Sequence, residues 1–361
     1  MIADTALRLT EFDYALPPER IAQSPLEARD HSRLMVLDRQ NRSMQHRTFR
    51  EIGEFLRAGD VLVLNATRVF PARLRGRKRS GGKAELLLLE PLAPSLSPGE
   101  RPLGGGSRWR ALVRGASAPG VDVVFPENLS ARLETLGAGG EWIVCFSREG
   151  VRAYLDRHGE MPLPPYIKRL EKNMKDSETY QTVFAREEGS IAAPTAGFHF
   201  TGALLKQLGV QGVKTIEVVL HVGWGTFRPI RTENIQDHAM LPENYQVSAE
   251  TAAKLNAARR DGRRIIAVGT TSARTLESVY DPDNFRFRAG SGAAKLFIYP
   301  GYRFRGVDAL ITNFHLPHST PLLLACAFYS GEPSFSLRVA YDEAIRGEYR
   351  FYSYGDAMFI Q

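Results

Sequence analysis

The sequence predicts an α/β protein: a larger α/β domain built from both chain ends, with an inserted small β-barrel domain. After residue 150 the chain repeats apolar strand, small polar turn and helix, which is typical of parallel sheets. Residues 83–147 instead show short strands between Gly- and Pro-rich turns, as small barrels do. The excess of Lys and Arg over Asp and Glu lies in the same region. We therefore assign residues 1–65 plus 156–361 to the α/β domain and 66–155 to the insert.

The larger domain begins with a strand at 60–70 that ends in Asn65, Thr67 and Arg68. Further along, "SIAAPTAGFHFTGALLKQL" leads into a helix for which Thr201 is the predicted N-cap. The segment "IEVVLHVGWGTF", which starts at residue 216, reads as a strand followed by a glycine turn. Each segment places polar residues directly after an apolar strand.

Two more segments of this kind complete the larger domain. Residues 264–280 predict a strand, a Gly-Thr-Thr-Ser turn and an amphipathic helix. Residues 307–328 predict a strand and a helix, with Thr320 as N-cap and Pro321 at the first helical position. Because the carboxyl ends of parallel strands form the ligand crevice of such sheets, we expect the turns to bring nine polar side chains to one edge. They are Thr195, His199, His221, Thr226, Thr270, Thr271, Ser272, Asn313 and His315.

The insert is predicted to be a small barrel or sandwich of short strands. Between the first two strands lies "LAPSLSPGERPLGGGS", a low-complexity stretch that we interpret as a mobile loop. The strands are expected at 83–91, 108–116, 121–126 and 141–147.

Positive charge is concentrated in this part of the chain. Residues 66–120 hold eleven Lys or Arg against three Glu, a net charge of +8, whereas the whole chain carries +7. Localised positive charge is the footprint of a protein that binds polyanions. It also fits a solvated strand-and-turn surface, but its confinement to one segment favours a nucleic-acid contact.

Composition excludes several classes of protein. A chain of 361 residues with 43% hydrophobic residues is typical of a globular protein of about two domains. The longest apolar run, 321–328, is too short to cross a bilayer, and the charged N-terminus does not resemble a signal peptide, so we expect a cytoplasmic protein that does not enter a membrane. The only cysteines, Cys145 and Cys326, cannot hold an iron–sulfur cluster or a disulfide framework.

Several catalytic motifs are absent from the sequence. His315 and His318 lie three apart, and His199, His221 and His238 could add ligands, but no spacing matches a zinc signature. The chain has neither a G-x-S-x-G nucleophile elbow nor a phosphate-binding P-loop, and "HVGWGT" is only a fragment of a dinucleotide fingerprint.

Two groups of polar residues remain as chemical candidates. The turn "GTTSAR" at a helix N-terminus suits a carboxylate or a phosphate. His238 and Glu243, in a segment expected to be a loop, could form either an acid–base pair or a surface hydrogen bond.

Long and unusual motifs in one order resemble the S-adenosylmethionine:tRNA ribosyltransferase-isomerase family of queuosine biosynthesis, over nearly the whole chain. The motifs are "LNATRVFPARL", "MPLPPYIKR", "YQTVFA", "AAPTAGFHFT", "HVGWGTFRPI", "AVGTTSARTLES" and "ITNFHLPHST". The resemblance implies an α/β domain with a β-barrel insert. It also implies a transferase that acts on tRNAs with a GUN anticodon carrying 7-aminomethyl-7-deazaguanine at the wobble position. Such an enzyme transfers and isomerises the ribosyl part of S-adenosylmethionine, leaving epoxyqueuosine and releasing adenine and methionine. The resemblance implies S-adenosylmethionine as a substrate, with no metal and no iron–sulfur cluster, and we expect a monomer.

The implied chemistry needs a base for a ribose C5′ hydrogen beside the sulfonium and a proton donor for adenine. The sequence does not assign which residue takes which role. The expected catalytic residues are His199, His221, His238, Glu243, Asn313 and His315. The expected S-adenosylmethionine-binding residues are Thr195, Gly223, Gly225, Thr226, Thr270, Thr271, Ser272 and Arg274. The expected tRNA-binding residues are Arg68, Arg73, Arg75, Arg77, Lys78, Lys83, Lys168 and Arg169.

One departure and two other functions bear on these expectations. Leu241 and Pro242 stand where the family usually has His-Ser, so the loop next to His238 lacks one imidazole. An S-adenosylmethionine-dependent tRNA methyltransferase would release S-adenosylhomocysteine. A non-catalytic tRNA-binding protein would release no product.

Overall fold

The computed structural model describes residues 6–92, 106–137, 139–169, 173–332 and 334–361. The chain forms two compact units. The first comprises Met1–Arg68, Pro164–Lys168 and Gln181–Gln361, and the second comprises Val69–Leu163 and Arg169–Tyr180. The predicted domain boundaries, 1–65 plus 156–361 against 66–155, stay a prediction, since compactness alone does not test independent folding.

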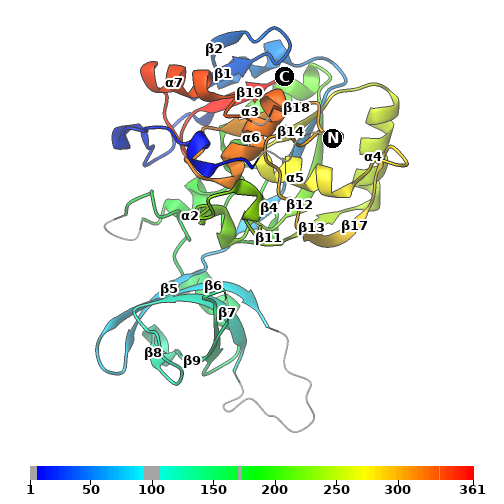
Figure 1. The fold of residues 1–361 in the computed structure, drawn as a ribbon. Coiled ribbons are helices and arrows are strands. Elements are labelled where there is room, and N and C mark those ends of the chain that lie inside the picture. Colours follow the sequence, from blue (N-terminus) through cyan, green and yellow to red (C-terminus); the bar gives the residue numbers. More distant parts are fainter. Residues whose placement is uncertain (1–5, 93–105, 138, 170–172, 333) are drawn as a thin grey trace. The chain divides into compact units, whose positions relative to one another are not determined.

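The first unit is built around a nine-stranded sheet of order β17-β13-β12-β3-β14-β18-β19-β1-β2 (Figure 1). Its four central strands β12, β3, β14 and β18 are mutually parallel, whereas β18 and β19 are antiparallel, so the sheet is mixed. The strands are β1 (Arg33–Leu37), β2 (Met44–Thr48), β3 (Val61–Asn65), β12 (Lys214–Leu220), β13 (Glu243–Val247), β14 (Ile265–Val268), β17 (Gly290–Ala294), β18 (Ala309–Asn313) and β19 (Ala357–Ile360).

Alternate residues of each central strand enter two separate cores, one on each face of the sheet. In β3, Val61 and Val63 pack into one core while Leu62 and Leu64 pack into the other. Every residue of β3, β14 and β18 is buried, which explains why these strands read as continuous apolar runs. Helices therefore cover both faces: α4 (Ala249–Arg260), α5 (Thr270–Val279), α6 (Thr320–Ser330) and α7 (Arg338–Arg346) on one side, and α3 (Gly202–Val210) on the other.

Two helix starts test the predicted N-caps. The Thr201 hydroxyl accepts a hydrogen bond from the Leu204 N–H, so the predicted cap of α3 is confirmed. The predicted cap of α6 is wrong by one residue, because the Ser319 hydroxyl accepts from the Leu322 N–H and Thr320 is already helical. Pro321 is therefore the second helical residue and not the first, as predicted, but it still lies in the first turn, where its missing N–H has no intrahelical acceptor to lose.

The second unit contains a closed barrel of order β10-β7-β6-β5-β8-β9 (Figure 1), which confirms the predicted fold class. Its strands are β5 (Arg73–Lys78), β6 (Lys83–Pro91), β7 (Arg108–Arg114), β8 (Asp122–Val124), β9 (Ser130–Leu136) and β10 (Trp142–Phe146). Buried side chains alternate with partly exposed ones along β6 and β10, as a filled barrel requires. Most of the loop expected at residues 92–107 lies outside the described residues.

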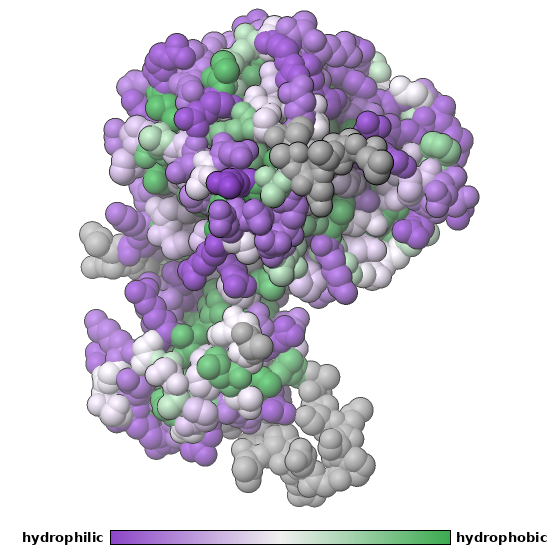
Figure 2. Space-filling model, in the orientation of Figure 1, coloured by the Kyte–Doolittle hydropathy of each residue, from purple (hydrophilic) through white to green (hydrophobic). Residues whose placement is uncertain are grey.

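The remaining strands and α-helices are short. They are β4 (Thr67–Val69), β11 (Glu187–Ser190), β15 (Tyr280–Asp281), β16 (Arg286–Phe287), α1 (Val151–His158) and α2 (Asp176–Thr179). Among the described residues, no helix has the length and apolar character needed to cross a membrane. On the face shown in Figure 2, hydrophilic side chains cover most of the first unit, and apolar side chains gather on part of the second.

Candidate active site at the strand ends

The carboxyl ends of the four central parallel strands bring most of the predicted polar residues to one edge of the sheet. β3 ends at Asn65, whose side-chain amide donates to the Leu220 carbonyl at 2.9 Å and accepts from the Leu220 N–H at 3.0 Å. These two hydrogen bonds hold the last residue of β12 in place, directly before His221. Neighbouring strands lie about 4.8 Å apart, so residues at these ends are close in space.

His221 is held through one ring nitrogen. Its Nδ1 lies 2.9 Å from the Thr67 hydroxyl, which lies 2.6 Å from the Ser190 hydroxyl. Ser190 in turn accepts from the Val222 N–H at 2.7 Å. Among the described residues no side chain or backbone group bonds Nε2 of His221. Burial lowers the pKa of His221, and the Glu187 carboxylate opposes that shift, so the ring is neutral near neutral pH with Nε2 open.

His199 is held through both ring nitrogens. Nδ1 lies 2.7 Å from the Ser32 hydroxyl, and Nε2 lies 3.2 Å from the Asn313 side-chain amide. Asn313 also donates to the Tyr352 carbonyl at 3.1 Å and accepts from the Thr195 hydroxyl at 3.3 Å. Burial, with the charges of Arg350 and Arg29, lowers the pKa of His199 to about 3. His199 and Asn313 thus form a neutral, buried network.

His315 follows β18 and is fixed along its backbone. Its N–H donates to the Tyr341 hydroxyl at 3.0 Å, and its carbonyl accepts from the Tyr14 hydroxyl. Its Nε2 lies 2.7 Å from the Thr312 hydroxyl. Burial lowers the pKa of His315 to about 3. Although part of the residue remains exposed to solvent, the imidazole is neutral over the physiological range.

Glu243 is not in a loop, as the sequence suggested, but begins β13 and is 4% exposed. It forms an ion pair with Arg274 of α5, accepts from the Gly223 N–H at 2.9 Å, and accepts from the Thr226 hydroxyl at 3.3 Å. His238 does not bond Glu243 within the described ranges. Its ring packs edge-on against Phe297 at 5.2 Å instead, and burial lowers its pKa.

The N-terminus of α5 lies at the end of β14. Gly269 adopts a left-handed φ of +89°, and a Cβ there would lie 3.5 Å from Ala196 in the segment that carries His199. The hydroxyls of Thr271 and Ser272 are buried and make no hydrogen bond within the described residues. Together with the free N–H groups of the first helical turn, they form a set of donors suited to an anion.

The predicted tRNA-binding residues are spread over several elements. Arg68 is exposed on β4, and Lys168 and Arg169 lie between α1 and α2, where Arg169 pairs with Asp176 at 3.0 Å. The other members of the set lie on β5 and at the start of β6: Arg73, Arg75, Arg77, Lys78 and Lys83.

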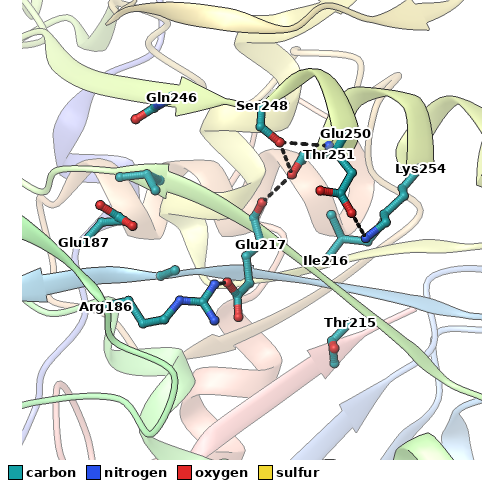
Figure 3. Close-up of a pocket in the computed structure, with 12 residues that line it drawn as sticks. Arg186, Glu187, Thr215, Ile216, Glu217, Gln246, Ser248, Glu250, Thr251 and Lys254 are labelled. Carbon is teal, nitrogen blue, oxygen red and sulfur yellow. Dashed lines mark hydrogen bonds and ion pairs between the residues drawn. The ribbon is translucent and has the colours of Figure 1, made fainter.

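A pocket of about 420 Å³ opens beside β12 (Figure 3). Its charged groups largely pair with one another, since Lys254 contacts Glu250 at 2.6 Å and Arg186 contacts Glu217. The pocket reaches Glu187, whose carbonyl accepts weakly from the Thr67 hydroxyl at 3.4 Å. It therefore adjoins the network around His221 but contributes none of the predicted catalytic side chains.

Several residues of these networks were not among the predicted site residues. Ser32, Thr67 and Tyr341 bond the predicted histidines or their backbone from distant parts of the chain, and Ser190 bonds the Thr67 hydroxyl. Thr67 could have been found from the sequence, because it lies two residues after Asn65, the last residue of a buried strand. The sequence around Ser32, Ser190 and Tyr341 has no feature that distinguishes them from ordinary surface residues.

Comparison with known proteins adds independent findings. The family model described as a queuosine biosynthesis protein matches residues 9–360. The S-adenosylmethionine:tRNA ribosyltransferase-isomerase of Geobacter sulfurreducens is 50% identical over 355 residues, which cover 98% of this chain and 99% of that protein. The protein of the same name from Moorella thermoacetica is 50% identical over 360 residues, covering 98% and 100%. The crystal structure of S-adenosylmethionine tRNA ribosyltransferase from Thermotoga maritima superposes with a TM-score of 0.53 at 39% identity, covering 97% of this chain and 100% of that one.

Proposed function

The chain belongs to the queuosine biosynthesis protein family, and from that premise we propose that its strand-end site carries out an S-adenosylmethionine:tRNA ribosyltransferase-isomerase reaction. The family match and the full-length relatives support this activity and do not favour a methyltransferase or a non-catalytic tRNA-binding protein. The observation that carries the assignment to this site is the convergence of polar side chains at the ends of four adjacent parallel strands.

We propose that His221 is the base that removes the C5′ hydrogen next to the sulfonium. A base needs an open lone pair and a ring that is neutral at working pH. Nε2 of His221 is open and the pKa of the ring is lowered. Thr67 holds the other nitrogen and so orients the ring. His238 remains the alternative, whereas the bonded nitrogens of His199 suit a positioning role.

The N-terminus of α5 is the proposed cradle for the methionine carboxylate. The unpartnered hydroxyls of Thr271 and Ser272 would donate to the carboxylate alongside backbone N–H groups. Arg274, predicted for the same role, already pairs with Glu243. In our proposal this pair fixes α5 against β13 and the turn at Gly223, rather than binding substrate or moving a proton.

The finer properties of the reaction are also proposals. They are a tRNA substrate with a GUN anticodon carrying the deazaguanine precursor, a monomeric enzyme, and action in the cytoplasm. The proposed independence from metal and iron–sulfur clusters rests on the two dispersed cysteines and the family resemblance.

The test is incubation of the protein with S-adenosylmethionine and tRNA that carries 7-aminomethyl-7-deazaguanine. We expect adenine and methionine in equal amounts, with epoxyqueuosine in the tRNA. The matched control is the same tRNA with guanine at the wobble position, which should release neither. Formation of S-adenosylhomocysteine, or tight tRNA binding without adenine release, would contradict the proposal.

A further inference from the structure

The barrel carries a cavity of about 810 Å³ that belongs to none of the networks above. Four neighbouring strands or their ends contribute to it: β8, β5, β6 and β7. Its exposed cations are Arg77, Lys83 and Arg114, together with Arg75. Among the described residues that line it, Glu85 is the only one with a carboxylate.

The basic side chains of the barrel fall into two groups. Some are neutralised by nearby carboxylates: Arg79 and Arg132 contact Asp122 at 3.0 and 2.8 Å, and Arg75 contacts Glu160 at 3.2 Å. Within the described residues, no ion pair joins a carboxylate to the second group, Arg77, Lys78, Lys83 and Arg114. Three of its four members, Arg77, Lys83 and Arg114, line the cavity.

Glu85 does not neutralise these three cations. Its carboxylate lies 3.6 Å from both Arg73 and Arg75, so it is already shared between two guanidinium groups. Arg114 lies directly opposite Glu85 in the ladder between β6 and β7, yet forms no ion pair with it within 4 Å. The cavity therefore keeps three uncompensated positive charges.

The position of two of these cations is unfavourable for the free protein. Arg77 and Lys83 are direct partners across the β5–β6 ladder, and like charges directly opposite each other destabilise a sheet. A bound anion would relieve this repulsion. The pairing thus favours an anion site over a purely structural surface.

The floor of the cavity is apolar. Gly76 and Gly115 contribute no side chains to it, and the close packing at Gly115 excludes one, because a Cβ there would lie 2.4 Å from the Lys83 carbonyl. Val124 is 37% exposed and Pro126 is also exposed beside it. An apolar surface within a ring of cations suits a nucleotide, whose base or sugar packs on the floor while its phosphates meet the cations.

We propose that this cavity binds a segment of the tRNA substrate through consecutive phosphates at Arg77, Lys83 and Arg114, with a nucleoside on the floor at Val124. The proposal rests on the proposed function for the identity of the RNA. It adds Arg114 to the predicted set and separates the cations that bind RNA from those that stabilise the barrel.

The test measures binding of an unmodified tRNA transcript with a GUN anticodon across a range of salt concentrations. Arg77→Gln, Lys83→Gln and Arg114→Gln remove the charge but keep part of the aliphatic stem at exposed strand positions. With a slope of about −0.9 per phosphate in log affinity against log salt, each lost contact should weaken binding about fivefold at 0.15 M salt. The triple variant should lose about 100-fold and reduce the slope by about 3.

Matched controls are Arg79→Gln and Arg132→Gln, which remove the same charge from residues bound to Asp122 in the same barrel. We expect wild-type affinity and slope from both. Equal losses in controls and test variants, or no loss in the triple variant, would overturn the proposal.

A second readout separates this proposal from the function itself. In the adenine-release assay with precursor tRNA, the triple variant should raise KM for tRNA while kcat stays within about twofold of wild type. A wild-type protein that releases no adenine refutes the proposed function but leaves the binding result intact. A triple variant with unchanged KM refutes the cavity as the RNA site even if the wild type is active.

Discussion

Substitution of Glu243 by Gln distinguishes a buried ion-pair partner from a catalytic base. Gln keeps the size of the side chain and can still accept from the Gly223 N–H, but it leaves Arg274 without a counter-ion. Breaking a buried pair typically costs about 3–5 kcal/mol. We expect the lower end, about 3 kcal/mol, because Arg274 also donates to the carbonyls of Ala294 and Leu296.

The assay combines thermal unfolding with single-turnover adenine release at a temperature well below Tm. A loss of about 3 kcal/mol corresponds to a fall in Tm of about 6–12 °C, at roughly 2–4 °C per kcal/mol for a large domain. Adding Arg274→Met should recover most of this loss, because it removes the unpaired charge. An unchanged Tm together with abolished adenine release would refute this reasoning and return Glu243 to the role of base.

Three further predictions concern the strand-end site. His221→Gln should lower kcat for adenine release by about 10²–10⁴-fold with tRNA affinity unchanged; a variant that keeps more than a tenth of the wild-type rate would exclude His221 as the base. His199 and His315 have pKa values of about 3 in the folded protein, against about 6.5 unfolded. Between these two values the unfolded state therefore binds more protons than the folded state, so each histidine should lower the free energy of unfolding by up to about 1.4 kcal/mol per pH unit on acidification. Urea unfolding between pH 7 and pH 4 should show a shallower fall of this free energy in His315→Asn than in the wild type. An unchanged fall would contradict the lowered pKa of His315. Ser272→Ala should raise KM for S-adenosylmethionine without lowering Tm, because the Ser272 hydroxyl has no partner in the described structure. The control Ser278→Ala removes another unpartnered hydroxyl of α5 and should leave KM unchanged. Equal effects of the two substitutions would refute the proposed carboxylate cradle.

The strand ends could be predicted from sequence because buried parallel strands are short apolar runs with polar residues after them. Asn313 ends a strand in which every residue is buried, and α5 begins directly after β14 as the Gly-Thr-Thr-Ser turn indicated. In these two cases the apolar run in the sequence coincides with a strand that is buried in the folded protein. The α6 cap was missed by one residue because Ser319 and Thr320 both have hydroxyls that can cap, and only backbone geometry decides between them.

The partners of the predicted residues could not be read from the sequence. Ser32 bonds His199 from 167 residues away, and Thr67 bonds His221 from 154 residues away. Which hydroxyl reaches which ring nitrogen depends on the order of strands in the sheet. Strand β5 was missed for a different reason: its outward positions are all arginine, so charge concealed the alternation around Leu74.

The order of strands also bears on how the substrate fits the site. His221 follows β12 and the cradle of α5 follows β14, and these strands flank β3. Two strand spacings separate them by about 10 Å. In an extended S-adenosylmethionine, five bonds join the carboxylate carbon to ribose C5′, a span of about 6 Å at the reach of an extended chain. A contact of about 3 Å at each end, to the carboxylate and to the C5′ hydrogens, brings the total to about 12 Å, the same order as the strand separation. In our proposal, one extended methionine chain therefore lies across the end of β3 with its carboxylate on α5 and its C5′ hydrogens toward Nε2 of His221. His199 cannot take the same role, because both of its ring nitrogens are already hydrogen-bonded.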